Sequence, residues 1–160
     1  IEASQFLIQK ILPYFINKNP DFKLLISGAS PSFIIKKLCK ENNNIELTGW
    51  IKDIRTSYAR GKIFVAPMMI GTGMQNKLIE AMAMGIPCIT STLANNAING
   101  IDQESIIVAN TEEEYILAIE SLLTDEAFYN KIAKGGQNLV KTNYNWESTT
   151  QKLVDLISKN

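Results

Sequence analysis

The chain has 160 residues, a length that favours one domain with room for a hydrophobic core. Its 16 Lys and Arg residues balance 16 Asp and Glu residues, and the zero net charge argues against a dedicated nucleic-acid binder. The sequence has no histidine, which excludes a Ser-His-Asp or Cys-His catalytic device and a His-ligated zinc site.

The sequence has no run of about 18 uncharged apolar residues, so we expect no transmembrane helix. The start, IEASQFLIQK, lacks the basic and apolar blocks of a signal peptide. Because it also lacks Met and begins inside an expected helix, we expect a fragment of a longer protein. Two cysteines, Cys39 and Cys88, fit a reducing compartment, and we expect a cytoplasmic protein, with peripheral membrane contact left open.

Short apolar runs alternate with segments of helical periodicity along the chain. The predicted elements are, in chain order, helix 4–19, strand 23–28, helix 30–41, strand 45–49, helix 53–61, strand 62–67, helix 74–85, strand 87–91, strand 105–109 and helices 112–125, 125–142 and 146–158. Near-continuous apolar strands separated by helices predict an α/β fold. We expect a Rossmann-like, doubly wound parallel sheet with helices on both faces.

Several residues predict where helices start, bend or stop. Pro13 is expected to bend or interrupt the first helix, and Ser30 and Asp53 are expected N-caps. Gly85 closes helix 74–85. Thr111 with Glu114 predicts a capping box, and the pair Asn95-Asn96 reads as polar loop after the fourth strand or as a sugar contact.

A glycine-rich turn, GTG at 71–73, lies between the third strand and helix 74–85. Ligands of open α/β sheets bind at the carboxyl ends of the strands, where such a turn lets the backbone and the helical N–H groups approach an anion. The turn is neither a Walker A loop nor a dinucleotide fingerprint, because Asn76 stands where both require glycine. A plain tight turn explains the pattern equally well.

Two charged residues follow the turn on the same predicted helix. Lys77 lies one turn into it, and Glu80 comes three residues later on the same face. A carboxylate repels phosphate but accepts hydrogen bonds from neighbouring sugar hydroxyls, as an acidic residue does for ribose in dinucleotide folds. The alternative is a surface ion pair with no ligand.

The segment GTGMQNKLIEAMAMGIPCITS (71–91) resembles the family 4 glycosyltransferases, many of which read G-x-G-x-x-x-K-x-x-E-A-M-A-x-G-x-P. Upstream, PDFKLLISG and GWIKDIRTSYARGKIFVAP also resemble this family, and the similarity continues to the YNWE at 144–147. The resemblance covers essentially the whole chain. It implies the C-terminal half of a GT-B fold, in which two Rossmann-like halves face a cleft.

The resemblance also implies a function. Residues 1–160 would be a single nucleotide-sugar-binding domain that lacks its first strand and the N-terminal domain, and that is inactive alone. The partners are a UDP- or GDP-sugar and a glycan or lipid-linked acceptor held mainly by the missing domain. Transfer would retain configuration and need neither a metal nor a cofactor, because positive side chains and helix N-termini stabilise the leaving diphosphate.

The family pattern assigns roles by position, although it gives no certain catalytic residue; Lys77 and Glu80 are the nearest candidates. Glu80 would bind the ribose hydroxyls and Lys77 would lie near the phosphates. Backbone contacts to the diphosphate or sugar would come from Gly71, Thr72, Gly73 and Met74, and contacts to the base from Gly49, Trp50 and Ile51.

The sequence departs from the family pattern at two positions. Thr72 stands where many relatives carry a second Glu, and Met69 where a basic residue is frequent. Trp50 is expected to stack on the base or to be half-buried by plain packing, and Arg55 to reach the diphosphate or to be solvated. Two other functions stay open: another GT-B-type enzyme, such as a nucleotide-sugar epimerase or a phosphorylase, and a non-catalytic flavodoxin-like or receiver-like module.

Overall fold

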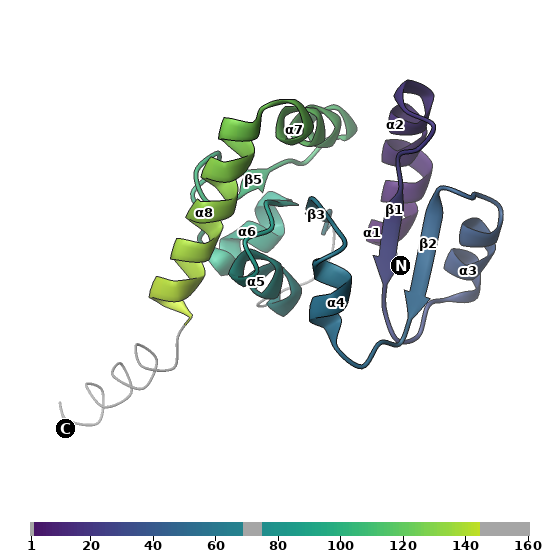
Figure 1. Cartoon of the computed structure of the whole chain (residues 1–160), viewed down its shortest axis with the longest axis horizontal. Helices are drawn as coiled ribbons and strands as arrows, with labels where there is room; N and C mark the ends of the chain where they lie inside the picture. The colour runs from purple at the N-terminus through teal and green to yellow at the C-terminus, as the bar shows by residue number, and fades with distance from the viewer. Residues whose placement is uncertain (1, 69–74, 145–160) are drawn as a thin grey trace.

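The computed structural model of the chain describes residues 2–68 and 75–144 (Figure 1). Strands and helices alternate along it, as the sequence predicts. The elements are α1 (Glu2–Phe6), the π-helix η1 (Leu7–Ile11), α2 (Leu12–Lys18), β1 (Leu24–Ser27), α3 (Phe33–Lys40), β2 (Ile45–Gly49), α4 (Ile54–Tyr58), β3 (Phe64–Ala66), α5 (Asn76–Ala83), β4 (Cys88–Thr90), α6 (Thr92–Ile98), β5 (Ile107–Val108), α7 (Glu112–Thr124) and α8 (Glu126–Asn143).

All five predicted strands are present, and every pairing within the described ranges is parallel. The pairings form two sheets, however: β1 with β2, and β3-β4-β5 in that order. In Figure 1, β1 lies on the side of its sheet that faces β3, and α4 connects the two sheets. The α/β class with parallel strands is confirmed, while the single continuous sheet is not formed by the described residues, because β1 and β3 do not pair.

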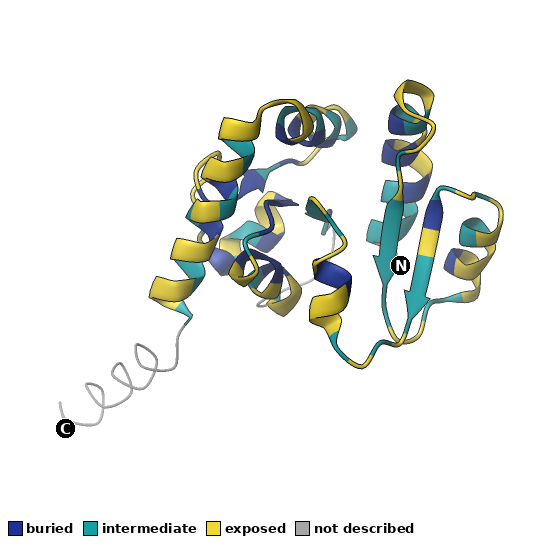
Figure 2. Ribbon diagram, in the orientation of Figure 1, coloured by how far each residue is buried: buried dark blue, intermediate teal, exposed yellow. Residues whose placement is uncertain are grey.

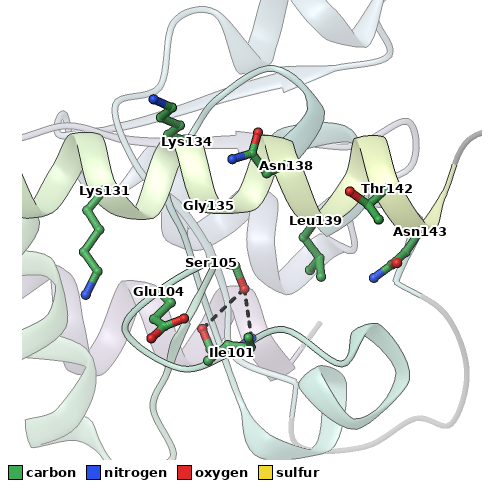
Figure 3. A pocket seen from close by; sticks show the side chains of 10 residues that line it. All are labelled: Ile101, Glu104, Ser105, Lys131, Lys134, Gly135, Asn138, Leu139, Thr142 and Asn143. Carbon is green, nitrogen blue, oxygen red and sulfur yellow. Dashed lines mark hydrogen bonds between the residues drawn. The ribbon is translucent and has the colours of Figure 1, made fainter.

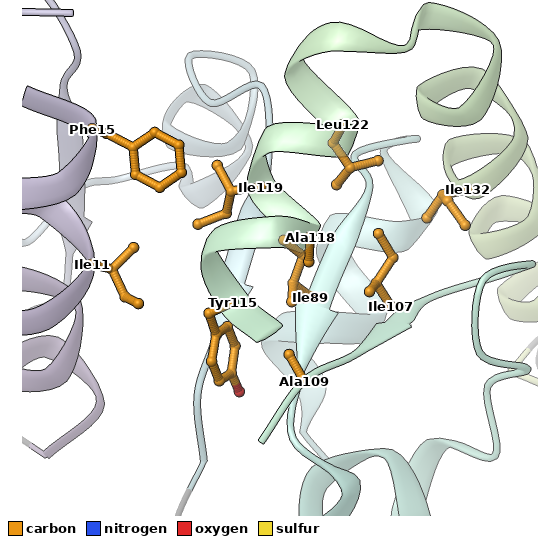
Figure 4. Packing of buried hydrophobic residues seen from close by; sticks show 10 residues of the cluster. All are labelled: Ile11, Phe15, Ile89, Ile107, Ala109, Tyr115, Ala118, Ile119, Leu122 and Ile132. Carbon is orange, nitrogen blue, oxygen red and sulfur yellow. The ribbon is translucent and has the colours of Figure 1, made fainter. Parts of the chain in front are cut away.

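Helices cover both faces of the three-stranded sheet. Neighbouring side chains of a strand point to opposite faces, so adjacent residues of β4 belong to different buried clusters. Ile89 of β4 belongs to a buried cluster that includes Tyr115 and Ile119 of α7 (Figure 4). Cys88, the adjacent residue, belongs to a second cluster with Met82 of α5 and residues of α6. Figure 2 shows the buried residues on the inner faces of these helices and exposed residues on their outer faces.

The first helix shows how Pro13 shapes the backbone. The N–H of Leu12 bonds to the carbonyl of Leu7, five residues earlier, which is the π-helical pattern. Pro13 follows at once, in the first turn of α2, where its missing N–H costs no intrahelical bond. The helical backbone therefore continues across Pro13 without a break, and its irregular part is the π segment Leu7–Ile11 that precedes this residue.

Local capping chemistry was predictable at three of four places. Asp53 caps α4, and Thr111 with Glu114 forms the full capping box of α7. The turn after α5 ends with Gly85 at φ 73°, where the Gly85 N–H bonds to Met82 O at 2.9 Å. The N-cap predicted at Ser30 is wrong.

The residue that caps α3 is Ser32, whose Oγ accepts the Ile35 N–H at 3.4 Å. The loop predicted for Asn95 and Asn96 is also wrong, since both lie inside α6. That helix is capped by Ser91. Predicted helix 146–158 lies outside the described residues.

Candidate functional site

Glu80 lies on the exposed surface of α5, the helix that follows β3. Its Oε2 accepts a hydrogen bond of 2.9 Å from the hydroxyl of Tyr58, which also lies 3.3 Å from the carbonyl oxygen of Lys77. Tyr58 is buried at the end of α4, with its ring edge against Phe64. A buried tyrosine thus holds one oxygen of an exposed carboxylate in a defined place.

The electrostatics of this contact keep the tyrosine a hydrogen-bond donor. Burial raises the pKa of Tyr58, and the hydrogen bond to Glu80 raises it further. The phenol is therefore protonated at physiological pH. Sequence reasoning predicted Glu80 but missed Tyr58, because the two residues are 22 positions apart.

Lys77 is exposed in the first turn of α5. Within residues 2–68 and 75–144, no ion pair joins it to Glu80, so the surface-pair alternative does not describe this helix. The carboxylate engages Tyr58 instead. The first N–H groups of any α-helix have no intrahelical acceptor, and those of α5 add positive potential near Lys77.

The other predicted contacts divide into two groups. Gly71, Thr72, Gly73 and Met74 lie outside the described residues, as does Met69. Gly49 and Trp50 lie at the carboxyl end of β2, where Gly49 adopts φ 66°. The half-buried packing considered for Trp50 is wrong, because its side chain is 71% exposed. Ile51, the next residue, is partly buried.

Arg55 is held by the carboxylate of Asp53, the residue that caps its helix. Its guanidinium donates to Asp53 at 2.7 and 2.9 Å, and both side chains are exposed. These bonds lower the pKa of Asp53, so the pair stays ionised at physiological pH. Of the two expectations for Arg55, contact with the diphosphate or exposure to solvent, the structure agrees with exposure to solvent.

A cavity of about 320 Å³ opens at the carboxyl ends of the three-stranded sheet. Its lining residues follow β3, β4 and β5 or come from α6 and α7: Pro67, Met68, Ser91, Leu93, Asn110 and Tyr115. This is the edge where ligands of α/β sheets bind. Sequence reasoning did not single out Tyr115 or Asn110, because nothing in their local sequence distinguishes them from core and cap residues.

A second hollow, of about 530 Å³, lies between α8 and the turn at residues 101–105 (Figure 3). That turn precedes β5, so the hollow is at the amino end of the strand. Gly135 brings the backbone of α8 against the turn, since a Cβ there would lie 2.0 Å from the carbonyl oxygen of Glu104. We attribute this hollow to the close packing of α8 against the turn and do not assign the candidate ligand site to it.

The described ranges contain neither a metal-binding cluster nor a membrane-spanning helix. Those residues include no group of three or more His, Cys, Asp or Glu side chains arranged to hold a metal ion. None of their helices is both long and apolar enough to span a bilayer.

Burial raises the pKa of Cys88, which makes this thiol a poor nucleophile.

Comparisons with known proteins agree with this architecture. The profile of the family described as glycosyl transferases group 1 matches residues 1–125. An *Escherichia coli* UDP-Gal:alpha-D-GlcNAc-diphosphoundecaprenol alpha-1,3-galactosyltransferase is 25% identical over 111 residues, which cover 69% of this chain and 28% of the enzyme. The chain spans less than half the length of the curated relatives that it matches.

Solved structures show the same fold. The C-terminal domain of a glycosyl transferase group 1 family protein (LpcC) from *Francisella tularensis* matches with a TM-score of 0.72 and 23% identity, over 91% of this chain and 78% of that one. *Anabaena* HepE in complex with UDP matches with a TM-score of 0.82 and 13% identity, over 100% of this chain and 46% of that one. The family match over most of the chain and the shared fold establish that this protein belongs to the glycosyl transferases group 1, with the architecture of GT-B glycosyltransferases.

Proposed function

We propose that the chain is the nucleotide-sugar-binding domain of a glycosyltransferase. The observation that carries the proposal is the exposed carboxylate of Glu80, held by the Tyr58 hydroxyl at 2.9 Å on the helix that follows β3. Two comparisons support it: the HepE structure holds UDP, and the *E. coli* relative uses UDP-galactose. The ligand of this chain is a UDP- or GDP-sugar.

Each part of the nucleotide has a partner in this proposal. Glu80 accepts hydrogen bonds from the ribose hydroxyls, and Lys77 lies near the phosphates. Residues 71–74 remain predicted backbone contacts of the diphosphate or sugar. The backbone of Gly49 to Ile51 borders the base, and the exposed indole of Trp50 can stack on it.

The chemistry proposed is transfer of the glycosyl group with retention of configuration. The departing diphosphate gains negative charge in the transition state, so a positive side chain and helical N–H groups aimed at it lower the barrier. Lys77 and the start of α5 supply these groups, and no metal ion or cofactor is needed. Activity in excess EDTA would support this part of the proposal, and its loss on chelation would contradict it.

The domain organisation is also part of the proposal. β1 and β3 each pair along one edge, and β1 lies on the side of its sheet that faces β3. A parallel strand from residues that precede Ile1 in the full-length protein would join the two sheets into one. The same preceding region would supply the acceptor-binding domain, and the likeness to the C-terminal domain of the LpcC protein supports this division.

The acceptor is a glycan or a lipid-linked glycan. The *E. coli* relative acts on a diphosphoundecaprenol-linked sugar, which supports an acceptor of this class. We place the domain in the cytoplasm, in polysaccharide assembly, with membrane contact made by the acceptor-binding half. The 160-residue chain alone is expected to transfer nothing, because half of the cleft is absent.

The test is a binding panel of UDP- and GDP-sugars with the full-length protein. A ligand at one hundred times its Kd stabilises the folded state by about 2.7 kcal/mol, so thermal unfolding identifies the base and sugar. Glu80→Ala should weaken nucleotide binding about ten-fold or more, since hydrogen bonds to a charged group are lost. Glu113→Ala, which removes an exposed carboxylate of α7, is the matched control. Full affinity in Glu80→Ala would refute the ribose contact.

A further inference from the structure

The helix α3 has one buried face and one exposed face. Ile35 is buried in a cluster with residues of β1 and β2, and Leu38 and Cys39, three and four residues later, pack against the same cluster. The opposite face of the helix has the regular spacing i, i+3, i+4, i+7, and all of its residues are exposed. This outer face of α3 consists of Phe33, Lys36, Lys37 and Lys40.

The first turn of α3 places apolar surface in solvent. The side chain of Phe33 is 80% exposed, more than any other large apolar side chain in the described part of the chain. Ile34, its neighbour, is 50% exposed, so the apolar area continues beside it. An exposed apolar area with polar residues around it is typical of an interaction site.

Positive charge follows this apolar area along the helix. Residues 22–40 contain four lysines and no Asp or Glu, although the whole chain has no net charge. Three of those lysines belong to the outer face of α3. Glu41 lies 3.9 Å from Lys37, whereas Lys36 and Lys40 form no ion pair with any residue that the structure describes. The outer face is therefore positively charged, with an apolar end.

The position of α3 in the fold leaves this face uncovered by the described residues. The helix packs against β2, at the end of the molecule far from α8 (Figure 1). The strand that we propose to join the two sheets would lie between β1 and β3, away from α3. Neither the described sheet nor its proposed completion therefore buries Phe33 and the lysines.

We infer that the outer face of α3 is a contact surface for a membrane that contains anionic lipid. The ammonium groups lie among the lipid phosphates, while the methylene stems of the lysines and the ring of Phe33 enter the apolar boundary of the bilayer. A nucleic acid would match the lysines but leave the phenyl ring without an apolar partner. One short helix binds a membrane weakly, so this contact adds to that of the acceptor-binding half.

The lipid-linked acceptor favours a membrane over an acidic protein as the partner, and to that extent the inference rests on the proposed function. Such an acceptor lies in a bilayer, so the enzyme works at a lipid surface. A weak second contact on the nucleotide-binding half would orient the protein there and leave it free to detach.

The first test is co-sedimentation of the full-length protein with vesicles of phosphatidylcholine, alone or mixed with phosphatidylglycerol. The wild-type protein should bind the mixed vesicles more tightly, with an affinity that falls as salt is added. Lys36→Gln combined with Lys40→Gln should weaken this binding about ten-fold or more, since each lysine near an anionic surface contributes about five-fold. The matched control, Lys131→Gln with Lys134→Gln, removes two exposed lysines of α8.

The second test reports contact at α3 even where the acceptor-binding half dominates vesicle binding. The fluorescence of Phe33→Trp should be quenched more strongly than that of the wild-type protein by brominated lipid in the mixed vesicles. Leu117→Trp is the matched control, because Leu117 is also exposed, on α7, and should add no quenching.

The inference requires both effects, and the absence of either one overturns it. Two further results would assign the face to another occupant. A wild-type dimer that Phe33→Ala dissociates would assign it to a second copy of the chain. A full-length Phe33→Ala protein that unfolds at a clearly lower temperature than Leu117→Ala would assign it to the acceptor-binding half.

The vesicle measurements contain no nucleotide, which separates this inference from the proposed function. The Kd for UDP should be the same in the double lysine variant and in the wild-type protein. Vesicle contact through α3 without any UDP binding would support the inference and contradict the proposed function. UDP binding without vesicle contact at α3 would do the reverse.

Discussion

The hydroxyl of Tyr58 and the carboxylate of Glu80 form a hydrogen bond of 2.9 Å that links α4 to α5. One member is buried and the other is exposed, so the pair connects the core to the surface at which we propose ribose binds. Among the described residues, Oε1 of Glu80 has no hydrogen-bond partner. Tyr58 thus fixes Oε2 and leaves Oε1 available to the proposed ligand, which makes Tyr58 a positioning residue.

Tyr58→Phe should weaken UDP binding by about three- to ten-fold, because the carboxylate loses the group that orients it. The effect should be smaller than that of Glu80→Ala. Calorimetric titration of both variants and of the double variant checks this. In the Glu80→Ala background the second substitution should add little, since the two residues act as a unit. Additive losses in the double variant would show that Tyr58 acts independently of Glu80.

The ion pair between α2 and α7 makes stability depend on pH. Glu120 accepts hydrogen bonds from Lys18 at 2.5 Å and from Tyr14 at 3.0 Å, and these bonds lower the pKa of Glu120 below its ordinary value of 4.5. A carboxyl group whose pKa is lower when folded contributes stability above its unfolded pKa and loses it as pH falls through its folded pKa.

Replacing Glu120 with Gln should therefore destabilise the protein at neutral pH, with a difference that shrinks below pH 4.5. Denaturant unfolding of both proteins between pH 7 and pH 3 measures the difference. The effect is expected to be small, because both side chains of the pair are partly exposed. Glu104→Gln is the control for removing a carboxylate elsewhere, and a difference that grows on acidification would contradict the expectation.

Gly135 is the position at which α8 approaches the turn before β5. An alanine Cβ would lie 2.0 Å from the backbone oxygen of Glu104, which cannot move without moving the turn. Gly135→Ala should destabilise the protein by about 1–3 kcal/mol, although alanine ordinarily favours a helix over glycine. Gly61→Ala is the matched control, because the nearest atom to its added Cβ is at 3.6 Å. Equal midpoints of denaturant unfolding for the two variants would contradict the close packing.

Features set by neighbouring residues were predictable from the sequence. The five apolar runs fall on the five strands, and the capping box of Thr111 and Glu114 forms as its spacing requires. Glu80 and Lys77 were recognised because their spacing after the glycines matches a family pattern. These sequence patterns are local, so they can be recognised without knowledge of the tertiary structure.

The features that could not be predicted from the sequence depend on contacts between distant residues. The segment of α6 is rich in Asn and weak in helix propensity, yet Ala94 and Ile98 bury one of its faces and Ser91 caps it. Whether β1 pairs with β3 depends on long-range packing, which no local pattern reports. The hydrogen bond of Tyr58 to Glu80 likewise arises only where separate segments meet, as does the burial of the Tyr115 hydroxyl, which has no partner among the described residues.

The most direct test of the central claim is a crystal structure of the full-length protein with UDP bound. We expect the ribose hydroxyls within about 3 Å of Oε1 of Glu80, with Tyr58 still bonded to Oε2. A nucleotide bound elsewhere, with Glu80 left facing solvent, would contradict the account.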